Sequence, residues 1–131
     1  MVVMSRPAAF LCFALAAGAM LPSAAVAQDA GEGERLFRQR CASCHTLQPG
    51  QNRTGPQLAG VMGRRAGSVE GARYSNGMQG SNIVWDEQSL DGFLANPRQV
   101  VPGTSMGVSL PDKDQRQAVI AYLKTIAGPA N

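Results

Sequence analysis

One short stretch, Cys41-Ala42-Ser43-Cys44-His45, constrains this chain more than any other. Cys41 and Cys44 are three residues apart, so on one helical turn their thiols lie on the same face, and the imidazole of His45 follows at once. Two thiols placed in this way can each form a thioether with a vinyl group of a haem, while His45 supplies an axial nitrogen to the iron. The spacing is typical of a c-type haem attachment site.

Three other interpretations of the motif are weaker. A zinc site needs a second pair of Cys or His ligands, but His45 is the only histidine and the third cysteine, Cys12, lies near the N-terminus. A thioredoxin-like redox pair needs a strand-helix-strand setting, which the sequence does not show. A disulfide between cysteines so close together closes a very small loop and constrains the unfolded chain little.

The N-terminus has the three parts of a secretory leader. Met1 to Arg6 is short and positively charged, residues 8–21 are apolar, and Ala25-Val26-Ala27 supplies small residues where a signal peptidase cuts. The apolar run is too short to span a membrane comfortably. We therefore expect a signal peptide over residues 1–27 and one domain over 28–131.

The expected leader predicts where the protein is located, and the charge of the chain argues against nucleic acid as a partner. The mature protein should lie outside the cytoplasm, which for a bacterial source means the periplasm, with no membrane anchor after leader cleavage. The formal charge of the whole chain is only +3. Its Lys and Arg residues are too scattered to indicate nucleic-acid binding.

Apolar periodicity predicts a helix at each end of the domain. The first should run from about Ala30 into the haem motif, with Gly33 and Phe37 on the same face as Cys41. The last should open between Pro111 and Asp114 and end before Gly128-Pro129. Because a glycine inside a helix is costly, Gly33 predicts tight packing against the last helix.

Between these helices the pattern is mostly irregular. Residues 49–82 are rich in glycine and proline and lack a sustained period, which favours a loop wrapped around a flat ligand. A short helix is expected over Asp86 to Leu94, stopped by Asn96-Pro97. Pro102-Gly103 then forms a turn that leads into Met106.

The histidine count limits the sixth iron ligand. With His45 the only imidazole, that position goes to methionine, lysine, the N-terminal amine, water or nothing. Met62, Met78 and Met106 follow the haem motif, and each alone is more often a core filler than a ligand. We favour Met106, because its loop is too far from any regular element to need a methionine for packing.

From the leader cleavage site onward, the chain resembles the class I c-type cytochromes, the small electron carriers of mitochondria and bacteria. Several motifs carry the resemblance in the right order: Gly33, Phe37 and Cys41 before Cys44-His45; Gly55-Pro56-Gln57-Leu58; Gly63-Arg64; Tyr74-Ser75 and Trp85; Leu90 and Asn96-Pro97; Pro102-Gly103-Thr104-Ser105-Met106; and Tyr122-Leu123-Lys124.

The resemblance implies an all-α cytochrome c fold with one covalent haem c, the terminal helices crossing and the Gly/Pro-rich loops around the haem. It implies His45 and Met106 as axial ligands, with the carbonyl of Pro56 accepting the other ring N–H of His45. It also implies a group of residues that holds a haem propionate: Arg64, Tyr74 and Trp85.

The chain departs from the family pattern at several positions. Phe93 replaces a tyrosine that often donates to the ligand sulfur, and Met78 replaces an asparagine of a buried water network. Val108 stands where an aromatic residue is common, and Ser105 where a basic one is. The lysine-rich docking face is thinned to three arginines expected near the haem edge: Arg40, Arg53 and Arg98.

A haem with protein ligands on both faces predicts electron transfer and no enzyme activity. The expected role is a monomeric periplasmic shuttle between a quinol-cytochrome c reductase and an oxidase, reductase or photosynthetic reaction centre. Two alternatives remain. The chain can be a dedicated haem subunit of a periplasmic dehydrogenase, or a weak peroxidase or gas binder if the Met106 bond is labile.

Overall fold

The computed structural model describes residues 24–128 of the chain. It contains five helices: α1 (Ala24–Arg40), α2 (Asn76–Gln79), α3 (Glu87–Ala95), α4 (Pro97–Val100) and α5 (Lys113–Thr125). The described residues form no strand, and only Arg65 and Val84 pair in an isolated antiparallel bridge. The all-α prediction is therefore confirmed.

The first helix begins earlier than the sequence predicted. It starts at Ala24 and not near Ala30, because alanine has the highest helix propensity and three of the first four helical residues are alanines. Residues 1–23 of the expected signal peptide lie outside the described residues. The expected cleavage after Ala27 stays a prediction.

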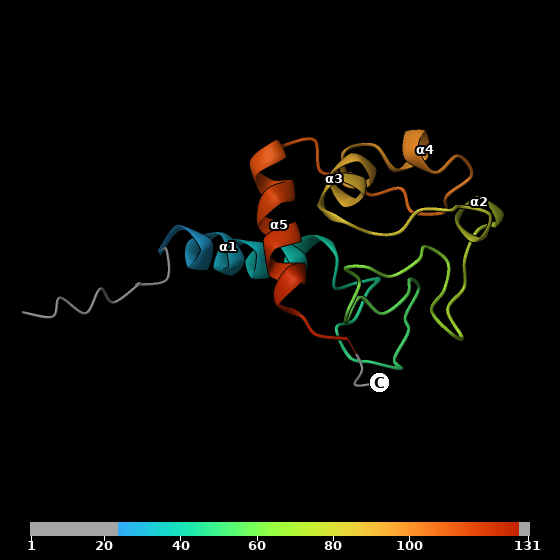
Figure 1. Cartoon of the computed structure of the whole chain (residues 1–131), viewed down its shortest axis with the longest axis horizontal. Helices are drawn as coiled ribbons and strands as arrows, with labels where there is room; N and C mark the ends of the chain where they lie inside the picture. Colours follow the sequence, from blue (N-terminus) through green and yellow to red (C-terminus); the bar gives the residue numbers. More distant parts are fainter. Residues whose placement is uncertain (1–23, 129–131) are drawn as a thin grey trace, which may run out of the picture.

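The two terminal helices cross at Gly33, as expected (Figure 1). A β-carbon on Gly33 would lie 2.0 Å from the carbonyl oxygen of Ala118 and 2.7 Å from Cβ of Tyr122, so only glycine permits this approach. Next to the crossing, the rings of Phe37 and Tyr122 pack with their centroids 5.9 Å apart. The crossing fixes the end of α1, and with it the haem motif.

The boundaries of helix α3 lie within one residue of the predicted Asp86 to Leu94. The Asp86 side chain accepts the backbone N–H of Ser89 at 2.7 Å, while the Ser89 hydroxyl accepts that of Asp86, so both ends of a capping box are present. Asn96 ends the helix and caps the one-turn helix α4, which begins at Pro97. Asn96-Pro97 therefore ends α3 and begins α4.

The glycine-rich segment forms the loops between α1 and α3 (Figure 1). It contains one element that the sequence did not predict, the single turn α2, whose N-terminus is capped by the Ser75 hydroxyl. Gly60 (φ +66°) lies against the segment that follows α5, where an added β-carbon would be 2.4 Å from Cα of Gly128. The loop at Gly60 is thereby held to the segment that follows α5.

The core combines residues from α1, α3, α5 and the loops. Its largest fully buried side chains are Val61 in the glycine-rich loops, Val101 and Leu110 in the segment between α4 and α5, and Val119 in α5. Within the part of the chain that the structure describes, no helix has both the length and the apolar character needed to cross a membrane.

Candidate haem site

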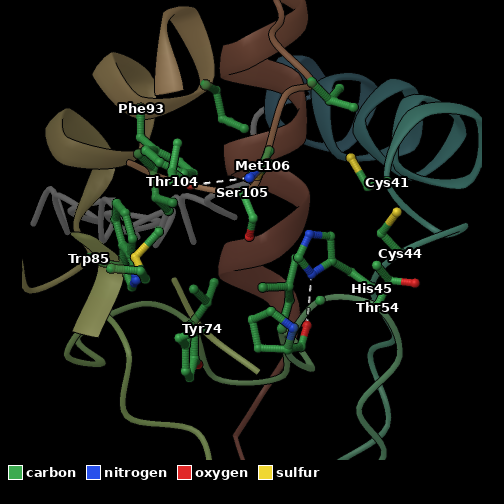
Figure 2. A pocket seen from close by; sticks show the side chains of 18 of the residues that line it. Cys41, Cys44, His45, Thr54, Tyr74, Trp85, Phe93, Thr104, Ser105 and Met106 are labelled. Atoms are coloured by element: carbon green, nitrogen blue, oxygen red, sulfur yellow. Dashed lines mark hydrogen bonds between the residues drawn. The ribbon is translucent and has the colours of Figure 1, made fainter. Parts of the chain in front are cut away.

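One cavity collects residues from the haem motif, the loops, α3, the segment around Met106 and α5. The cavity has a volume of about 220 Å³, and its walls are mostly apolar. Figure 2 shows Cys41, Cys44 and His45 on one side of the cavity, with Trp85 and Phe93 on the other. Four predicted haem-site residues, Cys41, Cys44, His45 and Trp85, therefore share one space.

The haem motif continues the last turn of α1. The backbone N–H of Cys41 donates to Phe37 at 2.9 Å, and that of His45 donates to Cys41 at 2.9 Å. Both thiols are free and partly buried, and burial raises the pKa of Cys41. Two cysteine sulfurs at the edge of an apolar cavity are placed to form two thioether bonds.

His45 is oriented by the residues that follow it. Its Nδ1 lies 2.7 Å from the carbonyl oxygen of Pro56, and because a carbonyl can only accept, Nδ1 donates and Nε2 keeps its lone pair. Burial lowers the pKa of His45, which favours the neutral ring. A neutral imidazole with a fixed tautomer is the form that binds a metal.

Gly55 lets the loop pass close to this ring. A β-carbon on Gly55 would lie 2.4 Å from Cε1 and 2.8 Å from Nδ1 of His45. Its backbone N–H also donates to Cys44 at 2.8 Å. The glycine thus brings the Pro56 carbonyl within reach of the histidine.

Met106 lines the cavity from the loop between α4 and α5. Its backbone N–H donates to Oγ1 of Thr104 at 3.2 Å (Figure 2). The loop is less remote than we expected, because Met106 is partly buried and packs against the hydrophobic core. Met78 also lines the cavity, whereas Met62 packs against the core without reaching the lining.

Arg64, Tyr74 and Trp85 also line the cavity. The Arg64 guanidinium donates to the carbonyls of Gln57 at 2.9 Å and Ala59 at 3.0 Å, and burial lowers its pKa. The Tyr74 hydroxyl accepts the backbone N–H of Val69 at 3.2 Å, which leaves its own proton available. The partly buried Arg64 guanidinium, together with Tyr74 and Trp85, is suited to binding an anionic group.

The three arginines of the expected docking face are all exposed, but their positions differ. Arg40 lines the cavity and points one nitrogen at the carbonyl of Ser109 at 3.5 Å. Arg53 donates to the carbonyl of Ala42 at 2.5 Å, inside the haem motif. Arg98 lies on α4 and is not part of the cavity lining.

The sequence predicted no role in the site for Arg73 or Thr104, which both line the cavity. Arg73 adds a second cation next to Tyr74, and the Thr104 hydroxyl fixes the backbone of Met106. A threonine two residues before the candidate ligand is a recognisable turn signal. No comparable signal marks Arg73, because its position depends on the path of the whole loop.

Comparison with known proteins defines the class of this molecule. The family model described as Cytochrome c matches residues 30–127, and the chain belongs to that family. It is an electron carrier, and members of the family bind one covalent haem c through a Cys-x-x-Cys-His motif, which is Cys41 to His45 in this chain.

Several relatives are similar over most of their length. Cytochrome c of Euglena viridis is 46% identical over 99 residues, which cover 75% of this chain and 97% of that protein. Cytochrome c2 iso-2 of Magnetospirillum molischianum is 44% identical, covering 66% and 90%. The structure of cytochrome cH from Methylobacterium extorquens matches with a TM-score of 0.69 and 38% identity, covering 74% of this chain and 98% of that one.

Proposed function

We propose that this chain is a periplasmic shuttle that carries single electrons between membrane-bound redox complexes. In this proposal Cys41 and Cys44 hold the haem by thioethers, and His45 and Met106 are its two axial ligands. Haem c supplies a reversible one-electron iron couple when it is bound. The observation that carries the proposal is that all four residues line one mostly apolar cavity.

The residues around the cavity favour the reduced state. A methionine sulfur stabilises ferrous iron relative to a second histidine. Buried apolar side chains such as Trp85 and Phe93 disfavour the extra positive charge of the oxidised state. Both effects raise the reduction potential, which suits an acceptor of electrons from a quinol-oxidising complex.

Arg64, Tyr74 and Trp85 are proposed to hold a haem propionate. A buried carboxylate is costly unless it is paired, and Arg64 is the only one of the three that carries a positive charge. We expect Arg64→Met to lower the reduction potential, because it removes a positive charge that opposes oxidation of the iron. A redox titration of both proteins measures the change.

The proposed partners are a quinol-cytochrome c reductase on one side and an oxidase, reductase or reaction centre on the other. Exposed arginines steer such encounters through long-range attraction, and the complexes stay weak enough for fast turnover. Arg98 is the cleanest probe, because Arg40 and Arg53 also contact backbone carbonyls.

Electron-transfer rates to an isolated oxidase test this docking. We expect Arg98→Glu to lower the second-order rate at low salt about tenfold, with the difference fading as ionic strength rises. Arg35→Glu makes the same charge change on α1, outside the proposed docking group of Arg40, Arg53 and Arg98, and should have a smaller effect. A rate that does not depend on salt contradicts arginine-mediated docking. Co-purification with one large dehydrogenase would instead favour a dedicated subunit.

One observation favours a second activity. Phe93 is buried at the cavity and offers no hydroxyl to a ligand sulfur, so the bond between Met106 and iron lacks that support. Carbon monoxide binding to the reduced protein at neutral pH would indicate a weak peroxidase or gas binder. A reduced spectrum that carbon monoxide does not change favours the electron carrier.

A further inference from the structure

We propose that Arg116 and Asp91 form a latch that fixes the exit of the loop carrying Met106, residues 101–111. The latch sets how readily an outside ligand displaces the Met106 sulfur. This inference rests on the proposed ligation of iron by Met106. Arg116 does not line the cavity, so its role is that of a positioning residue.

The latch is a set of hydrogen bonds from one guanidinium group. Nε of Arg116 donates to Oδ1 of Asp91 at 2.8 Å, and Nη2 faces Oδ2 at 3.4 Å. Nη1 donates to the carbonyls of Leu110 at 3.0 Å and Pro111 at 2.8 Å. One side chain of α5 therefore ties α3 to the end of the Met106 loop.

The loop exit makes few other hydrogen bonds. The backbone N–H of Leu110 donates to Leu94 at 2.7 Å, and Arg40 reaches Ser109 only at 3.5 Å. Among the described residues, the backbone N–H groups of 107–109 donate no hydrogen bond. Leu110 is the fourth residue after Met106, so a shift at the latch passes to Met106 through a segment whose backbone N–H groups donate no hydrogen bond.

The burial of Arg116 makes this latch more costly to break than an ion pair between two exposed side chains, although Asp91 itself is 37% exposed. Arg116 is only 8% exposed, and a buried guanidinium requires both its carboxylate and its carbonyl acceptors. Lysine keeps the charge but lacks the planar fork that reaches three acceptors at once. Arg116→Lys should therefore loosen the loop exit while keeping the charge.

The chain offers a matched control. Lys124 and Glu87 form another ion pair between α5 and α3, but both are exposed and neither bonds to the Met106 loop. Disrupting this pair removes a contact between the same two helices without touching the loop exit. Comparing variants of the two ion pairs therefore separates the effect of the loop exit from the effect of losing a contact between α3 and α5.

The experiment measures imidazole binding to the oxidised holoprotein, because imidazole must displace the sixth ligand. We expect Arg116→Lys to bind imidazole about tenfold more tightly than the parent, which corresponds to about 1.4 kcal/mol. Lys124→Ala should stay within about twofold of the parent. Asp91→Asn removes the negative charge of the ion pair but keeps the size of the side chain, and it should also increase the affinity for imidazole. This variant tests the proposal if Arg116→Lys does not fold.

A Met106→Ala background separates this proposal from the ligand assignment. There the substitution Arg116→Lys should leave imidazole affinity unchanged, because no sulfur remains to be displaced. If Met106→Ala alone does not tighten imidazole binding, the ligand assignment is wrong. The latch proposal is wrong if Met106→Ala tightens imidazole binding but Arg116→Lys binds imidazole as the parent does. It is also wrong if Lys124→Ala increases the affinity for imidazole as much as Arg116→Lys does.

Discussion

At the residue scale, the contact between Gly55 and His45 is the most sensitive part of the site. The methyl group of Gly55→Ala would lie 2.4 Å from Cε1 of His45, so the ring or the loop must move. We expect the free energy of unfolding of the holoprotein to fall by about 1–3 kcal/mol, as for other overpacked sites. Denaturant titration measures this change.

Gly92→Ala is the control for this prediction. Its methyl group would be 3.7 Å from Cγ2 of Val100, which is ordinary contact, and alanine favours the helix by about 0.5–1 kcal/mol. We expect this variant to be at least as stable as the parent. Equal stability of Gly55→Ala and Gly92→Ala would contradict the tight contact at His45.

At the scale of the helix, Gly33 and Gly31 give opposite predictions on the same element. A methyl at Gly33 would meet the carbonyl of Ala118 at 2.0 Å, whereas one at Gly31 meets nothing within 4 Å. We expect Gly33→Ala to destabilise the protein by about 1–3 kcal/mol and Gly31→Ala to stabilise it by about 0.5–1 kcal/mol. Thermal unfolding of both variants compares them, and shifts of the same sign would contradict the observed helix crossing.

The cap of α3 predicts a pH dependence. Hydrogen bonds from the backbone and side chain of Ser89 lower the pKa of Asp86 below its ordinary 3.8. Because the folded state has the lower pKa, the cap contributes fully above the unfolded-state pKa and its contribution is lost as pH falls through the folded-state pKa. Asp86→Asn keeps a capping oxygen that does not titrate.

Unfolding free energies measured over a pH series test this prediction. We expect the stability of the parent to fall more steeply than that of Asp86→Asn below about pH 4. Identical pH dependence of the two proteins would show that the Asp86 carboxylate is not stabilised in the folded state.

At the scale of the whole molecule, the sequence predicted the elements that local rules control. Alanine and apolar spacing specify the terminal helices, Asp86 and Asn96-Pro97 bound α3, and Gly33 indicates the helix crossing. The helix boundaries depend on residues a few positions apart, which is why the pattern reveals them. The crossing involves distant partners, Ala118 and Tyr122, but a glycine inside a helix is itself a local signal of close packing.

Features that depend on long-range contacts were not predictable. The Arg116 side chain joins two helices and a loop, and nothing in its local sequence distinguishes it from a surface arginine. The same limit applies to Met106, whose packing against the core requires the path of the entire loop. The cavity itself is assembled from five separate segments.

The central claim is that Met106 and His45 ligate the iron of one covalently bound haem from within this cavity. A weak far-red charge-transfer band in the oxidised protein reports a sulfur-iron bond directly. We predict that the parent shows this band, that Met106→Ala abolishes it, and that Met62→Ala and Met78→Ala retain it. A parent without the band, or a Met106→Ala variant that keeps it, would contradict the account.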